Sequence, residues 1–238
     1  MSFSAASFLL LTLSIVALGI AGYAWQRRSL PGALPLSLMG VSVAAWLCGY
    51  AMQLSSLSFP LALWWVRFQF VGIVALPVAW LWFAAEYTGS LPWLNRRRVW
   101  LPGIVPVLTM GIILTNDVHR LFWQSITLSV KDAFTLVEAV HGVWFWIHVA
   151  YSYFCLLAGT FVLLRFILRI SGRFYAQVGV LLTVVSAPLL ANALDLAGIR
   201  VWDRLDLTPF GFAVSLAMLA WSLFRLRMFE ILLMQESR

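Results

Sequence analysis

Arg67 is the residue of this sequence whose position most needs a chemical explanation, because it falls inside a long apolar stretch. An arginine at the centre of a membrane span costs about 2.5–3.5 kcal/mol, and such a residue usually faces the protein interior with a partner. Asp195 lies at a similar depth in another apolar stretch, with Asn192 about one turn deeper. Two hypotheses stay open. Arg67 either forms a structural ion pair or reaches the outer interface, or it binds an anionic or polar ligand group in an outward-facing pocket.

Other side chains extend the second hypothesis into a candidate ligand site. Trp64 and Gln69 flank Arg67, and a ring such as that of Trp64 either stacks on a ligand or belongs to a belt of interfacial aromatic residues. His148 and Tyr151 lie in a further apolar stretch. The candidate ligand-binding residues are Arg67, Gln69, Trp64, His148, Tyr151, Asn192 and Asp195.

The histidines and cysteines do not form a metal-binding pattern. His141 and His148 are seven residues apart, whereas two ligands on one helix need a spacing of three or four. Cys48 and Cys155 fall in separate apolar stretches, where buried free thiols are expected rather than a disulfide. We therefore predict no metal and no cofactor.

Enzyme chemistry is equally hard to assemble from this sequence. It contains no HExxH, GxSxG or phosphate-binding loop motif, and no paired carboxylates within an apolar stretch. A retinal Schiff base needs a lysine inside a span, but Lys131 is the only lysine and lies in a polar connection. The chain itself is not expected to be an enzyme.

The elements that must position these side chains are membrane spans. The sequence is 63% hydrophobic and 11% charged, whereas soluble chains carry about 25% charged residues. A span needs about 20 mostly apolar residues, and only helices or closed barrels satisfy their backbone groups in lipid. The sequence predicts an all-α, seven-transmembrane helix bundle with spans at residues 3–25, 33–54, 59–86, 99–116, 142–170, 175–197 and 207–228.

The basic residues predict the orientation of this bundle. Four basic residues fall on one side of the predicted spans and eleven on the other, and the richer side is expected to be cytoplasmic. The N-terminus is then outside and the C-terminus inside the plasma (inner) membrane. The first span lacks a basic segment before it and is expected to remain uncleaved. The net charge of +7 is therefore a topology signal, and no nucleic-acid partner is expected.

The longest connection, between Asn116 and Gly142, is predicted to lie outside. Residues 123–130 alternate polar and apolar side chains, residues 131–132 suggest a turn, and residues 133–140 are again rich in strand formers, so a β-hairpin is expected. It would either close a pocket as a lid or simply cover the helix ends.

Proline and aspartate add local detail to three of the spans. Asp206, followed by Leu-Thr-Pro, is typical of a helix start in which a carboxylate caps free amides, and this cap is sufficient to explain Asp206. Pro77, Pro188 and Pro209 are expected to interrupt the third, sixth and seventh spans, and cavities or movement are expected near such kinks.

Five segments together resemble the seven-transmembrane sensory region at the N-terminus of bacterial histidine kinases and diguanylate cyclases. They are residues 65–72 (WVRFQFVG, resembling W-x-R-x-Q-aromatic-x-G), 86–89 (EYTG), 115–123 (TNDVHRLFW), 188–192 (PLLAN) and 206–210 (DLTPF). Their order and spacing cover nearly the whole chain.

This resemblance implies a sensor of an external or membrane-borne ligand, working in two-component signal transduction, whose last helix feeds a cytoplasmic kinase or cyclase. Residues 1–228 would be the sensory domain, and residues 229–238 the start of a signalling helix that continues into an output domain absent from this sequence. The implied partners are the lipid bilayer, an unknown small molecule and a second copy, in a homodimer formed through the output domain. A small permease-like transporter and a structural membrane anchor remain the alternatives.

Overall fold

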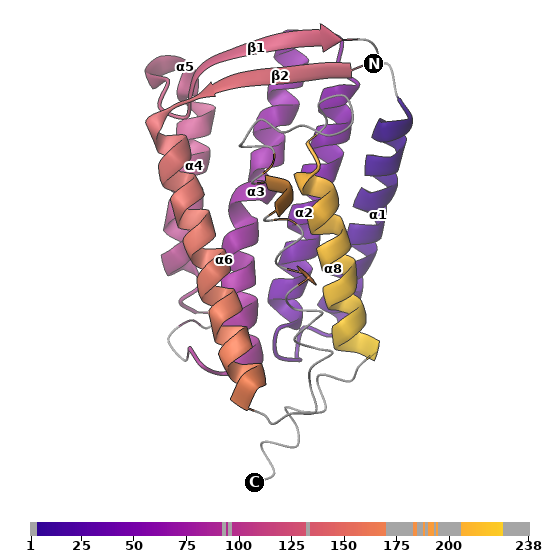
Figure 1. Ribbon diagram of the computed structural model, residues 1–238, viewed down its shortest axis with the longest axis vertical. Helices are drawn as coiled ribbons and strands as arrows, with labels where there is room; N and C mark the ends of the chain where they lie inside the picture. Colours follow the sequence, from indigo (N-terminus) through magenta and orange to yellow (C-terminus); the bar gives the residue numbers. More distant parts are fainter. Residues whose placement is uncertain are drawn as a thin grey trace.

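The apolar stretches fold as helices in the computed structural model, and a two-stranded sheet lies across one end of the helix bundle (Figure 1). The structure describes residues 4–91, 94, 97–131, 134–169, 183–184, 188, 190–192, 194 and 206–225. Its elements are α1 (Ala5–Gln26), α2 (Ala33–Leu54), α3 (Phe59–Thr88), α4 (Trp100–Leu114), α5 (Asn116–His119), β1 (Trp123–Lys131), β2 (Phe134–His141), α6 (Val143–Arg169) and α8 (Thr208–Arg225).

Four of the described helices are long and apolar enough to cross a membrane, namely α1, α2, α3 and the Val143–Phe166 part of α6. Two shorter apolar helices, Trp100–Leu114 and Thr208–Trp221, occupy the predicted fourth and seventh spans. The predicted span at residues 175–197 and the predicted signalling helix at 229–238 lie largely or wholly outside the described residues. A mostly helical, multi-pass membrane chain is therefore confirmed.

Close contact between α2 and α3 depends on a residue without a side chain. A Cβ atom added to Gly72 would lie 2.1 Å from the carbonyl oxygen of Ser42, so the two backbones approach too closely for any other residue. On the opposite face of α2, the hydroxyl of Ser14 in α1 donates to the carbonyl oxygen of Ala44 at 2.9 Å. Small residues and hydroxyl groups are typical contacts between helices in lipid, where the hydrophobic effect does not drive helices together.

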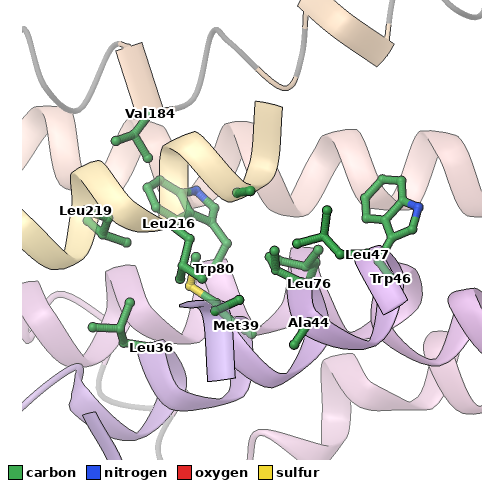
Figure 2. Packing of buried hydrophobic residues seen from close by; sticks show 14 of the residues in the cluster. Leu36, Met39, Ala44, Trp46, Leu47, Leu76, Trp80, Val184, Leu216 and Leu219 are labelled. Atoms are coloured by element: carbon green, nitrogen blue, oxygen red, sulfur yellow. The ribbon is translucent and has the colours of Figure 1, made fainter. Parts of the chain in front are cut away.

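The largest apolar cluster fills the space where α2, α3 and α8 meet (Figure 2). Met39 from α2, Trp80 from α3 and Leu216 from α8 are buried in it. The indole nitrogen of Trp80 donates to the carbonyl oxygen of Leu156 in α6 at 3.1 Å, so a large ring is buried without losing its hydrogen bond. The cluster thereby fixes α8 against the first half of the chain.

The start of α8 has the predicted cap. The Asp206 carboxylate accepts a hydrogen bond from the backbone amide of Thr208 at 2.8 Å. Pro209 lies in the first turn of α8, where a backbone amide has no helical partner, so its missing amide leaves no bond unmade. Contrary to the prediction, Pro209 therefore does not interrupt the helix. α3 likewise continues through Pro77 to Thr88. Pro188 is helical, but its neighbours 185–187 and 189 lie outside the described residues.

The connection between α5 and α6 contains two antiparallel strands. They lie where the alternation of polar and apolar residues predicted strands. Ile126 pairs with Ala139 and Trp123 with His141, and the register shifts between Trp123 and Ser125. The sheet lies over the helix ends nearest to α5 (Figure 1). Its position, beside the ends of α3, α4 and α6, brings three strand residues to the site described next.

Candidate functional site

A cavity of about 300 Å³ lies between α2, α3, α6 and the start of α8. Its size is at the lower end of the range of small-molecule sites, about 300–1,000 Å³. Trp123 of β1 together with Ala139 and His141 of β2 also line it, so the sheet contributes to its wall. The sheet is therefore part of the cavity wall, as the lid hypothesis requires.

Gln69 is the candidate residue that α3 directs into this cavity. It is 6% exposed, and its side-chain nitrogen donates to the amide oxygen of Gln53 in α2 at 2.7 Å. Both glutamines line the cavity. A hydrogen bond between two buried side chains is costly to break on one side only, because the remaining partner stays unsatisfied.

His148 reaches the cavity from α6. One ring nitrogen lies 3.3 Å from the hydroxyl of Thr109 in α4, and the other lies 3.3 Å from the hydroxyl of Ser152 one turn along α6. The same Thr109 hydroxyl accepts a hydrogen bond from the indole of Trp144 at 3.0 Å. His148 is thus oriented on both sides by neutral hydroxyl groups.

Asn192 completes the group of predicted residues that the structure brings together. Its side-chain oxygen accepts a hydrogen bond from the hydroxyl of Tyr153 in α6 at 2.9 Å, and both residues line the cavity. Gln69, His148 and Asn192 therefore meet around one space, although they are far apart in the sequence.

Arg67, Trp64 and Tyr151 are not among the residues that line this cavity. Arg67 forms an ion pair with Asp117, and Asp195, its predicted partner, lies outside the described residues. Trp64 is 56% exposed and stacks on Phe68, as expected for an interfacial ring. Among the described residues Arg67 thus has an ion-pair partner, as the structural hypothesis expects, and that partner is Asp117.

Tyr151, which does not line this cavity, makes a contact between two helices. Its hydroxyl donates a short hydrogen bond to the carbonyl oxygen of Pro102, which joins α6 to α4. Pro106, one turn further along α4, leaves the helix intact.

Cys155, one turn from Tyr151, is a buried free thiol, and Cys48 in α2 is also free. In the described ranges no group of three or more histidine, cysteine, aspartate or glutamate side chains is arranged to hold a metal ion.

Three residues of the cavity wall were not predicted as part of the site. Two lie at the start of α8, and one lies in α2. The hydroxyl of Tyr50 in α2 accepts a hydrogen bond from the backbone amide of Asp206 at 2.8 Å, and Tyr50, Asp206 and Thr208 all line the cavity. The cap motif identified Asp206, but that explanation hid the second role of this segment. α8 runs from this point toward the end of the bundle opposite the sheet (Figure 1).

The turn before the sheet is built around Asn116, which is 6% exposed. Its side-chain oxygen accepts hydrogen bonds from the backbone amides of Phe122 and Trp123 at 2.9 and 3.0 Å, and its nitrogen donates to the Trp123 carbonyl oxygen at 2.9 Å. The amide of Gly142 then donates to the Phe122 carbonyl oxygen at 2.8 Å, which ties the end of β2 to the same turn. The sheet is thereby held over the cavity.

Comparison with known proteins identifies the group to which this architecture belongs. Residues 9–232 match the family model described as the N-terminal 7TM region of histidine kinase. The match includes all five segments on which the resemblance was based. No curated protein matches the chain.

Proposed function

This chain belongs to the family of N-terminal 7TM regions of histidine kinases, and on that premise we propose that it senses a small molecule in the cavity described above and signals through α8. The family assignment makes the chain a membrane sensory region rather than a catalytic domain. The ligand, from outside the cell or from the membrane, would reach the cavity on the side of the sheet.

The proposal includes an orientation for the bundle. For the seven spans predicted from apolar length, the eleven basic residues on one side support an orientation with the sheet outside and the end of α8 in the cytoplasm. A bacterial plasma (inner) membrane fits this arrangement. The output would be a cytoplasmic kinase or cyclase acting as a homodimer, as in two-component signalling.

The observation that carries the proposal is that the cavity wall includes the first turn of the helix that would transmit the signal. Asp206, Thr208 and Phe212 line the cavity, and α8 then packs against the apolar core of α2 and α3. A ligand changes the balance between two states only when it binds one of them more tightly. A ligand that contacts the start of α8 has such a difference in affinity between two states whenever α8 is placed differently in them.

The experiment joins the chain through α8 to a cytoplasmic histidine-kinase domain and measures phosphorylation of a response regulator. Val149→Trp fills the cavity from α6, whereas Leu157→Trp introduces the same indole side chain at a position of α6 that is 56% exposed. We expect Val149→Trp to change kinase output at least about threefold, since a population shift of that size needs under 1 kcal/mol, and Leu157→Trp to leave it unchanged.

Equal output from both variants, with equal amounts of folded protein in the membrane, would contradict a sensing role for the cavity. Unchanged regulation after all spans are replaced by an unrelated anchor would favour the anchor alternative. Solute uptake by liposomes containing the chain would favour the transporter alternative.

A further inference from the structure

The cavity has no lysine or arginine among its described lining residues, and of its two histidines His148 is held between the hydroxyls of Thr109 and Ser152. Arg67 is bound to Asp117 and does not line the cavity. Asp206, the one carboxylate in the described lining, already accepts the backbone amide of Thr208 as a helix cap. A ligand anion would lose its hydration here without a lysine or arginine in the described lining to offset the loss, and a ligand cation would find only the Asp206 carboxylate, which already caps α8. The lining therefore favours an uncharged molecule.

Two aromatic pairs in the cavity wall suit an apolar ligand body. The rings of Trp46 and Phe212 lie 5.4 Å apart between centroids, at the side of α2 and α8. The rings of Phe70 and Trp123 lie 5.4 Å apart at the side of α3 and the sheet. A volume of about 300 Å³ between them accommodates a small molecule of about the size of one substituted ring.

Thr208 supplies an unused hydrogen-bonding group. Its side chain is 1% exposed and lines the cavity, and its hydroxyl has no hydrogen-bond partner in the part of the chain that the structure describes. Other polar groups in the wall already have partners, as in the pairs Gln69–Gln53 and Tyr153–Asn192. Buried polar groups are almost always hydrogen-bonded, so an exception in a cavity wall points to a ligand that supplies the missing bond.

We propose that the cavity binds an uncharged amphipathic molecule, with a ring-sized apolar body and one hydroxyl or carbonyl group that bonds to the hydroxyl of Thr208. This inference rests on the proposed sensing function and adds the chemical class of the ligand and the residue that contacts its polar group. Because Thr208 is the first residue of α8, the ligand contacts directly the helix that transmits the signal.

Three probes with the same body separate the possible charges. They are the para-fluorinated forms of 2-phenylethanol, phenylacetate and 2-phenylethylammonium, and their binding to the full chain in detergent is followed by fluorine NMR against empty micelles. We expect the alcohol to bind at least about tenfold more tightly than either ion, because an ion loses far more hydration than the alcohol on entering a largely apolar cavity whose one described carboxylate already caps α8.

Variants of α8 then test the contact with Thr208. Thr208→Val keeps the shape but removes the hydroxyl, and we expect the affinity for the alcohol to fall about five- to tenfold, whereas Thr208→Ser retains the affinity within about twofold. Ser215→Ala is the matched control. Ser215 is also buried in α8 with an unpartnered hydroxyl among the described residues, but it does not line this cavity.

Equal or tighter binding of either ion would overturn the inference, as would absence of alcohol binding, an unchanged affinity in Thr208→Val, or full binding in the cavity-filling variant Val149→Trp. None of these results decides the kinase-output experiment, which responds to filling of the cavity whatever molecule it normally binds. The two proposals therefore fail separately.

Discussion

The guanidinium of Arg67 in α3 lies 2.8 Å from the carboxylate of Asp117 in α5, so an ion pair joins the bundle to the turn that precedes the sheet. Arg67 is 22% exposed and Asp117 is 73% exposed. The two residues are fifty positions apart, and each belongs to one of the five segments on which the resemblance was based. The charge inside an apolar helix is thus neutralised at the bundle surface, beside the cavity rather than within it.

This exposure predicts a small energetic contribution from the pair. We expect Asp117→Ala to lower the free energy of unfolding by at most about 1 kcal/mol, since exposed ion pairs contribute roughly 0–1 kcal/mol. A double-mutant cycle with Arg67→Ala, measured by denaturation in mixed micelles, should give a coupling energy of the same size. A coupling above about 3 kcal/mol would show that water does not screen the pair, contrary to its exposure.

Asn116, next to Asp117, should matter far more for stability. Its buried side chain makes three hydrogen bonds to the backbone of Phe122 and Trp123. We expect Asn116→Ala to cost about 2–4 kcal/mol, since each bond contributes about 0.5–1.5 kcal/mol and buried groups are left unsatisfied. Asn116→Asp keeps both accepted bonds but loses the donated one, so its cost should be intermediate. Equal stability of wild type and Asn116→Ala in mixed-micelle denaturation would contradict this view of the turn.

The helices and strands could be predicted because their signals are local. Apolar length located the helices, alternation located β1 and β2, and Asp206 marked the start of α8. The effect of proline was only partly predictable. Pro77 lies inside α3, and the helix continues through this residue. In a membrane helix, contacts around the proline compensate for the backbone hydrogen bond that it cannot make.

The site was harder to predict because it depends on contacts between distant residues. Gln69, His148 and Asn192 were predicted from their polarity within spans and line the cavity, whereas Arg67 and Tyr151 were predicted on the same ground and do not. The partner of Arg67 was not predictable, since Asp117 and Asp195 both lie near the same predicted membrane face. Thr208 gave no signal of its own, because its motif was already explained by a helix cap.

The Gln69–Gln53 bond predicts a non-additive pair of mutations. Gln69→Leu leaves the Gln53 amide buried without a partner, and we expect a loss of about 1–3 kcal/mol in the free energy of unfolding. The double variant Gln53→Leu with Gln69→Leu removes both polar groups and should be more stable than either single variant. Denaturation of all four proteins in mixed micelles tests this, and strictly additive losses would exclude a mutual bond.

Gly72 provides the sharpest test of the packing that positions the cavity wall. A Cβ atom at this position would lie 2.1 Å from the Ser42 carbonyl oxygen, so Gly72→Ala must separate α2 from α3. We expect a loss of at least about 2 kcal/mol, because overpacking of a rigid backbone contact cannot be relieved by a rotamer change. Gly103→Ala in α4 is the matched control. Nothing lies within 4 Å of its added Cβ, so it should be neutral or stabilising by up to about 1 kcal/mol. Similar unfolding midpoints for the two variants in mixed micelles would rule out the close approach of α2 and α3.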